Sequence, residues 1–294
     1  RIIAMPHEHE QNRRSWNAVT PAHQSHKRDQ AEFFRGGGST LFDDEVQLLG
    51  DVRGLRVAHL QCNCGQDSLS VAALGAHVTG VDISDAAIDE AVALASAIDR
   101  DDSTTFVRAD VVDWMHDTDE RFDRALSTYG TIGWLSDLGA WARGVHRILK
   151  PGGYLAFLEF HPLVWSFRAL SKDAVTWGDS YFQRGAIHEA DGVNDYVARS
   201  GEALTPMGRV EGIADFENPQ PAVGFQYTCA DIVSALTAAG LQIDAMKEYP
   251  YSNGCKLFDG MVEQPGRRYG LPEGVASLPL MLGIRARRTL GTGS

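Results

Sequence analysis

The sequence is poor in cysteine and has no long apolar run. Its four cysteines, Cys62, Cys64, Cys229 and Cys255, are too few for a disulfide framework and lack the paired spacing of a zinc site. No apolar run approaches the roughly 20 residues that a membrane-spanning helix needs, and the first residues lack the apolar stretch of a signal peptide. We therefore expect a protein of a reducing, cytoplasmic compartment that binds no metal.

Basic residues are also scarce. The chain has 27 Lys and Arg against 39 Asp and Glu, a formal net charge of −12, which repels phosphate backbones and anionic lipid and disfavours nucleic acid or membrane partners. Its 294 residues, 44% of them hydrophobic, suffice for one large α/β domain or two small ones. We expect a small-molecule substrate, leave a homodimer open, and expect Met5 to be the native start because the chain begins at Arg1.

Residues 54–85 have the pattern of a strand, a tight turn, a helix and a second strand. The short apolar run 56–60 is followed by a Cys/Asn/Gly turn, a helical pattern over 69–74 and a second apolar run, 78–81, that ends at Asp82. In such a β-α-β unit, ligands bind outside the carboxyl ends of the parallel strands. Asp82 can therefore accept two hydroxyl hydrogens from a ribose.

The remaining core elements follow in the same alternation. Ser84 is placed to cap a helix over 85–98, and the Pro-Gly-Gly turn at 151–153 ends another over 134–149. A third helix is predicted over 229–239. Further strands are predicted over residues 105–107, 122–129, 154–160, 241–249 and 279–287.

Three motifs resemble the class I S-adenosylmethionine-dependent methyltransferases, in their small-molecule, natural-product subgroup. They are LQCNCG at 60–65, GVDIS at 80–84 and LKPGGYLAF at 149–157. Of the glycines in the family's loop only Gly65 is retained. His59 and Gln61 replace an acid and a glycine, whereas Asn63 can adopt left-handed backbone angles. A nicotinamide dehydrogenase would instead need GxGxxG at 61–66, which QCNCGQ lacks.

The resemblance implies an α/β Rossmann-like, doubly wound sheet of about seven strands with the last strand antiparallel. It divides the chain into an N-terminal cap (1–45), a cofactor-binding core (46–160), an aromatic-rich substrate-lid insertion (161–228) and the C-terminal part of the core (229–294). The alternative for 161–228 is a structural insert with a small core of its own. In the cap, the alternative is a surface helix near 12–19 with a flexible glycine turn at 36–38. The HEHE run at 7–10 fixes no metal geometry, so we expect a solvated tail there.

The resemblance also implies S-adenosylmethionine as the cofactor and S-adenosylhomocysteine as its product. Asp82 is then the ribose ligand, and Asp110, at the end of the third strand, accepts from the adenine amino group. Val111 is expected against the purine. The other expected cofactor-binding residues are Trp16, Gly37, Leu60, Gln61, Cys62, Asn63, Gly65, Ile83, Ser127 and Thr128.

Methyl transfer from a sulfonium mostly requires alignment, and a base is needed only if the nucleophile must lose a proton. Glu159 and His161 lie two apart at the end of the fifth strand, hence on one side of it, with Tyr129 one strand away and His23 on the cap. These four residues are the catalytic candidates. The alternative for the first two is structural, with Glu159 capping the strand end and His161 binding backbone.

The LQC loop, the EFHP strand end and the aromatic insertion are loosely similar to bacterial methyltransferases of secondary metabolism that modify indole C3 in tryptophan-containing cyclic dipeptides. The resemblance therefore implies methylation of a small aromatic natural product, with indole C3 as the best candidate. N- or O-methylation of another metabolite is the alternative. A non-catalytic subunit that binds S-adenosylmethionine or S-adenosylhomocysteine is an alternative of another class.

Overall fold

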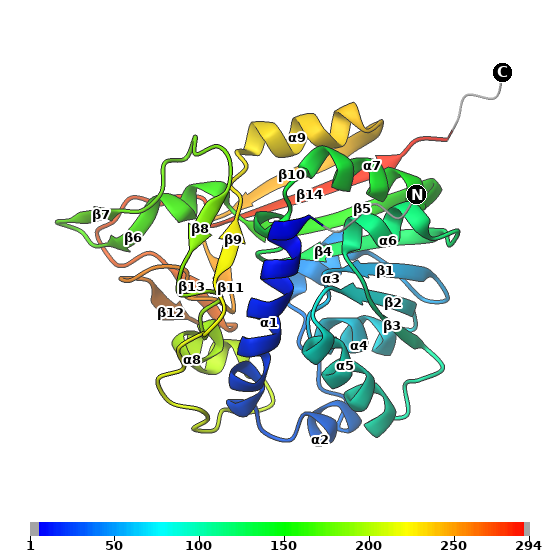
Figure 1. Cartoon of the computed structure of the whole chain (residues 1–294), viewed down its shortest axis with the longest axis horizontal. Helices are drawn as coiled ribbons and strands as arrows, with labels where there is room; N and C mark the ends of the chain where they lie inside the picture. The colour runs from blue at the N-terminus through cyan, green and yellow to red at the C-terminus, as the bar shows by residue number, and fades with distance from the viewer. Residues whose placement is uncertain (1–5, 291–294) are drawn as a thin grey trace.

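The structure, a computed structural model, describes residues 6–290, so the expected start at Met5 lies outside the described residues. Seven strands form one sheet in the order β10-β14-β5-β4-β1-β2-β3 (Figure 1). Only β14 is antiparallel to its neighbours. This confirms the predicted α/β sheet and its antiparallel last strand. The strands are β1 (Arg56–Leu60), β2 (His77–Asp82), β3 (Thr104–Arg108), β4 (Phe122–Thr128), β5 (Leu149–Phe160), β10 (Leu241–Tyr249) and β14 (Met281–Arg288).

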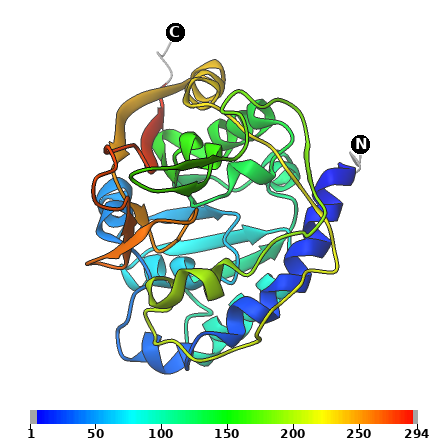
Figure 2. The ribbon, with the colours of Figure 1, turned by 90° about the vertical axis from the view of Figure 1, so that its left-hand side faces the viewer.

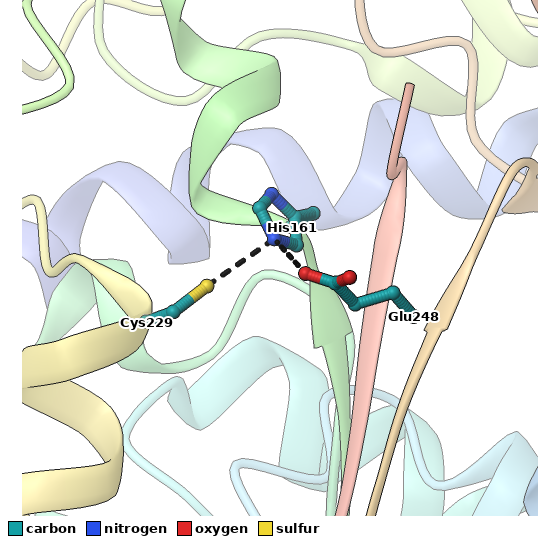
Figure 3. Close-up of side chains that lie close together, drawn as sticks. All are labelled: His161, Cys229 and Glu248. Carbon is teal, nitrogen blue, oxygen red and sulfur yellow. Dashed lines mark hydrogen bonds and ion pairs between the residues drawn. The ribbon is translucent and has the colours of Figure 1, made fainter. Parts of the chain in front are cut away.

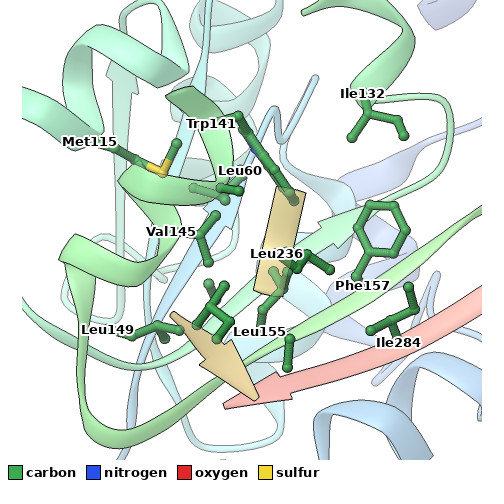
Figure 4. Packing of buried hydrophobic residues seen from close by; sticks show 14 of the residues in the cluster. Leu60, Met115, Ile132, Trp141, Val145, Leu149, Leu155, Phe157, Leu236 and Ile284 are labelled. Carbon is green, nitrogen blue, oxygen red and sulfur yellow. The ribbon is translucent and has the colours of Figure 1, made fainter. Parts of the chain in front are cut away.

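Helices cover both faces of the sheet, because successive strand residues point to opposite sides. Val57 packs with α3 (Asp43–Leu49) and α4 (Gln66–Ala73). Leu60 packs with α6 (Val111–Asp117), α7 (Leu138–Ile148) and α9 (Cys229–Ala238) on the other face, around the fully buried Trp141 and Phe157 (Figure 4). Helix α5 (Asp85–Ala97) packs against β2 and β3. These helices cover the faces of the sheet and leave the carboxyl ends of the parallel strands to be covered by other segments.

Two predicted boundaries differ from the structure. The helix expected from residue 134 starts at Leu138, because Asp137 accepts the Ala140 amide hydrogen at 2.8 Å and residues Ile132–Trp134 form a 3₁₀ turn, η1. Residues 150–153 are a bulge within β5, since Leu149 pairs with Phe122 and Tyr154 already pairs with Arg124. Helix α7 ends before the Pro-Gly-Gly turn, as predicted. Pairing between β5 and β4 resumes at Tyr154, directly after that turn.

The N-terminal helix α1 (His7–Ser25) lies between the sheet and the insertion (Figures 1 and 2). Its Val19 packs with Val193 and Ala222 of the insertion, and α5 contacts its other side. Helix α2 (Gln30–Arg35) follows it. The insertion contains η2 (Pro162–Ser166), β6 (Phe167–Leu170), β7 (Val175–Trp177), β8 (Ile187–Glu189), α8 (Tyr196–Ser200), η3 (Gly201–Leu204) and β9 (Ala222–Gly224). A small sheet follows β10, from β11 (Ser252–Asn253), β12 (Val262–Gln264) and β13 (Arg268–Gly270).

Over residues 6–290, no helix combines the length and the apolar character that crossing a membrane requires.

Candidate active site

The loop after β1 has the backbone of a glycine turn although two of its residues have side chains. Gln61, Asn63 and Gly65 all have positive φ angles, 56°, 50° and 73°. Asn63 stabilises this conformation locally, since its Oδ1 accepts the Cys64 amide hydrogen at 2.7 Å. A Cβ on Gly65 would lie 2.7 Å from the Phe106 ring, which explains why this glycine is retained. The left-handed conformation predicted for Asn63 is confirmed.

Asp82 links this loop to the end of β2. Its buried carboxylate accepts the Asn63 amide hydrogen at 2.8 Å and the Ser84 amide hydrogen at 2.9 Å. Burial raises the pKa of the Asp82 carboxyl, and the Ser84 and Asn63 amides oppose that shift. Each oxygen keeps lone-pair capacity for a further donor. Asp82 therefore lies where a ribose ligand is expected and also holds the loop in shape.

Asp110 lies one strand further along, at the end of β3. Its Oδ1 caps α6 by accepting the Val112 and Asp113 amide hydrogens at 2.8 and 3.3 Å. Its Oδ2 lies 2.5 Å from His9 Nδ1. Burial acts to raise the pKa of Asp110, but the hydrogen bonds from His9 and from the Asp113 and Val112 amides prevail and lower it.

The first turn of α1 corrects the sequence analysis. His9 was expected on a solvated tail, yet it is 5% exposed and contacts Asp110, just after β3, and Ser136, in the loop before α7. Further along α1, Arg13 donates to Asp85, and Asn17 Oδ1 accepts from Ser84 Oγ at 2.7 Å. The cap therefore docks on the predicted cofactor site through polar side chains.

Trp16 and Gly37 are the two cap residues predicted to bind cofactor, and that role stays a prediction. Trp16 packs edge-on against Trp134, with ring centroids 5.5 Å apart, within the apolar cluster that joins α1 to the insertion. Gly37 lies on an exposed turn after α2, with no atom within 4 Å of a Cβ built on it. The structure does not bring Gly37 to the strand ends.

The other predicted cofactor residues do gather at the carboxyl ends of neighbouring parallel strands. Gln61 donates its amide to the Thr131 carbonyl at 2.9 Å, while its buried Oε1 has no hydrogen-bond partner among residues 6–290. This orphaned acceptor fits a cationic ligand group. The residues at these ends are Leu60, Gln61, Cys62, Asn63, Gly65, Asp82, Ile83, Asp110, Val111, Ser127 and Thr128.

Glu159 holds the loop that follows β4. One carboxylate oxygen accepts the Gly130 and Phe160 amide hydrogens, and the other accepts from the Thr131 and Ile132 amides and the Thr131 hydroxyl. Burial raises the pKa of Glu159, and these amides oppose the shift. The contacts support the structural alternative for Glu159, while a role as base stays a prediction.

Tyr129 precedes that loop in a strained conformation, with a φ of 31°. Its ring stacks on Phe160 at 5.6 Å, and its hydroxyl accepts from the Asn253 amide at 2.9 Å. Burial raises the pKa of the Tyr129 phenol well above its usual range. The strain lies at the tip of β4, where cofactor and substrate were expected to meet.

His161 meets two side chains from other elements, Cys229 at the start of α9 and Glu248 on β10 (Figure 3). Its Nε2 lies 3.0 Å from Glu248 Oε1 and 3.2 Å from Cys229 Sγ. Burial lowers the pKa of His161, and Glu248 opposes that shift. The three ligand atoms lie within 4.8 Å of one another, which is compatible with a metal ion.

The other ring nitrogen argues against a metal at this cluster. His161 Nδ1 accepts the Leu163 amide hydrogen at 3.2 Å, so the proton of the neutral ring is on Nε2. A metal on Nε2 would require a proton on Nδ1, facing the Leu163 N–H, whereas metal-bound histidines donate their second ring nitrogen to an acceptor. The cluster therefore fits an Nε2–H that donates to Glu248, in agreement with the predicted backbone-binding alternative.

His23, in the last turn of α1, faces the insertion. Its Nε2 donates to the Asn194 carbonyl at 3.1 Å, so Nδ1 carries the lone pair. Its ring contacts Tyr196 with centroids 4.3 Å apart. Burial lowers the pKa of His23 to about 4, which keeps the ring neutral at pH 7.

The buried ring of His59 is expected to make the stability of the protein depend on pH. Its Nδ1 lies 2.7 Å from Ser68 Oγ, and burial lowers the pKa of His59 to about 4, from 6.5. The unfolded chain therefore binds more protons between these values. The contribution of the neutral His59 ring to the free energy of unfolding is fully present above pH 6.5. About 2 kcal/mol of it is lost between pH 7 and pH 5.

The test compares the free energy of unfolding at several pH values in wild type and in His59→Asn, which keeps a polar group near Ser68 but does not titrate. We expect the wild type to lose more stability on acidification. Equal slopes would contradict a buried neutral His59.

The sheet order and strand directions define the fold of S-adenosylmethionine-dependent methyltransferases. Residues 57–153 match the family described as methyltransferase domain. A ubiquinone biosynthesis O-methyltransferase of Alkalilimnicola ehrlichii is 31% identical over 134 residues, which are 45% of this chain and 53% of that protein. The chain therefore spans about half the length of this curated relative.

Solved structures extend the likeness over most of the chain. An S-adenosylmethionine-dependent methyltransferase from Mesorhizobium loti superposes with a TM-score of 0.58 at 23% identity, covering 86% of this chain and 99% of that one. The [4+2]-cyclase SpnF superposes with a TM-score of 0.56 at 16% identity, covering 96% and 97%. At these identities the superpositions show the fold alone.

Proposed function

We propose that this protein is an S-adenosylmethionine-dependent methyltransferase that acts on a small molecule. The observation that carries the proposal is the left-handed loop at Gln61, Asn63 and Gly65, joined to Asp82 and covered by α1. The matched methyltransferase domain spans these residues, and the relative from Alkalilimnicola supports a methyl-transfer function.

The residues at the strand ends fit the cofactor, group by group. Asp82 has acceptor capacity for the ribose hydroxyls, and Asp110 Oδ2 for the adenine amino group. Gln61 Oε1 would accept from the α-ammonium group. When bound, the cofactor supplies an activated methyl group, while the chain aligns the acceptor and excludes water.

Of the four catalytic candidates, His23 is the one that the contacts favour as proton acceptor. Its Nδ1 lone pair has no partner within residues 6–290, whereas Glu159 and His161 Nδ1 are engaged by backbone amides. The Tyr129 oxygen already accepts from Asn253. A substrate O–H or N–H would pass its proton to His23 Nδ1 and keep the electron pair on the nucleophile.

The narrower proposal for the substrate is a flat aromatic metabolite, with indole C3 of a tryptophan-containing cyclic dipeptide as the first candidate and N- or O-methylation as the alternative. Its support is the aromatic content of the insertion. Trp177 and Phe182 are 70% and 71% exposed there, but Phe167 is buried in an apolar cluster. A ring-lined lid therefore draws on only part of this set. The cytoplasmic location and a homodimer also stay proposals.

The first test mixes the protein with methyl-labelled S-adenosylmethionine and a panel of indoles, tryptophan-containing cyclic dipeptides, phenols and amines, and locates the label by NMR. We expect label in an aromatic acceptor. His23→Ala is expected to transfer at least about 100-fold more slowly, the scale of general base catalysis, with its affinity for S-adenosylhomocysteine retained.

Wild-type turnover in His23→Ala would contradict its role as proton acceptor. Binding of S-adenosylhomocysteine without transfer to any acceptor would favour the second candidate, a non-catalytic cofactor-binding subunit.

A further inference from the structure

The contacts of His9 fix where its proton lies. Nε2 faces the Ser136 amide nitrogen at 3.1 Å and the Ser136 hydroxyl at 3.0 Å. Because the amide can only donate, Nε2 must carry a lone pair, and the proton of the neutral ring is on Nδ1. His9 therefore donates Nδ1–H to Asp110 Oδ2, 2.5 Å away.

These contacts leave one acceptor position on the Asp110 carboxylate, at Oδ2, for a ligand. Its Oδ1 is engaged by the Val112 and Asp113 amides at the start of α6. Oδ2 accepts from His9 and has capacity for one more donor. The His9 bond is the one hydrogen bond to Oδ2 that forms within residues 6–290, and together with the two amides on Oδ1 it sets how the planar carboxylate is turned.

Helix α1 presents His9 from a fixed platform. Asn17 Oδ1 accepts from the Ser84 hydroxyl and the Ala86 amide at the start of α5, and Arg13 donates to Asp85. The helix thus spans the ends of β2 and β3, the two strands whose ends carry Asp82 and Asp110.

We propose that His9 is a positioning residue for adenine recognition, which turns Asp110 Oδ2 toward the 6-amino group of the cofactor and couples the docking of α1 to the presence of that group. The inference rests on the proposed function. It assigns part of the cofactor's specificity to the N-terminal cap, through a side chain that touches Asp110 and not the reacting atoms.

Two ligands separate this role from a merely structural one. S-adenosylhomocysteine has the 6-amino donor, whereas S-inosylhomocysteine has a 6-oxygen that offers Asp110 no hydrogen at that position. A His9 that only fastened α1 would change the affinity for both ligands by the same factor. A positioning His9 changes their ratio.

Two substitutions of His9, His9→Asn and His9→Gln, separate the contributions of its two ring nitrogens. The amide of asparagine lies close to the place of Nδ1 and can still donate to Asp110. The amide of glutamine reaches the place of Nε2, so His9→Gln keeps an acceptor for Ser136 and loses the donor to Asp110. Arg14→Ala, on an exposed position of the same helix, is the matched control, and melting temperatures show that each variant is folded.

Calorimetry on the full chain gives the dissociation constants. We expect wild type, His9→Asn and Arg14→Ala to prefer S-adenosylhomocysteine by roughly 10- to 100-fold, the scale of a hydrogen bond to a charged group. We expect this preference to fall below about threefold in His9→Gln.

An undiminished preference in a folded His9→Gln overturns the inference, as does an equal loss for both ligands. The absence of any preference in wild type overturns it too, because Asp110 would then not recognise adenine. Failure of the wild type to bind either ligand would instead overturn the proposed function.

Discussion

Replacing Asp82 with alanine is expected to weaken the binding of S-adenosylhomocysteine by roughly 10- to 100-fold, or about 1.5–3 kcal/mol, the scale of hydrogen bonds to a charged group. The substitution removes the carboxylate that is proposed to accept from the ribose hydroxyls. It also leaves the Asn63 and Ser84 amides, which shape the loop, without their acceptor. Isothermal titration calorimetry of S-adenosylhomocysteine measures the effect.

The control for this variant is Asp89→Ala. Asp89 lies on the exposed side of α5, a few residues after Asp82, and its replacement should leave the affinity unchanged. An Asp82→Ala protein that is folded and binds as tightly as wild type would remove Asp82 from the cofactor site.

Glu159→Gln is expected to lower the free energy of unfolding by about 3–4 kcal/mol, because the amide leaves buried backbone donors unpaired and directs its own N–H group at them. Gly130, Thr131 and Ile132 all donate to this carboxylate. At 2–4 °C for each kcal/mol in a chain of this size, the melting temperature should fall by roughly 6–16 °C. Thermal unfolding followed by circular dichroism measures the change.

Glu263→Gln is the comparison for Glu159→Gln, since Glu263 is exposed on β12 and its substitution should alter stability by less than about 0.5 kcal/mol. A Glu159→Gln protein with wild-type melting temperature and reduced methyl transfer would assign Glu159 the role of base and not of loop anchor.

The sequence predicted the sheet and the loop correctly because both depend on local chemistry. The apolar runs of β1 and β2 are short and bounded by turn residues, and Gly65 has a positive φ of 73°, which glycine adopts at no steric cost. Asp82 follows β2 directly, so its place at the strand end needed no long-range information. The hydrophobic periodicity and the turn residues are sufficient to predict these strands and the loop between them.

The cap could not be predicted in the same way, because its contacts reach far along the chain. Asn12 pairs both atoms of its amide with the backbone of Val223, and Ser15 donates to the Gln220 carbonyl. Polar residues on a helix normally face water, so hydrophobic periodicity gave no sign that this face is buried. The spacing of the buried residues His9, Asn12, Val19 and His23 at helical intervals is the signal that was available.

The sequence by itself determined the order of the core elements and the acid at each strand end, because these are properties of neighbouring residues. Tertiary structure alone decided what those groups contact. It placed His9 on Asp110, gave the Glu159 oxygens to a loop, and set the proton of His161 on the nitrogen facing Glu248. The physical reason is that a hydrogen bond depends on which donor meets which acceptor in space, and residues 28, 87 and 101 positions apart in the chain meet only after folding.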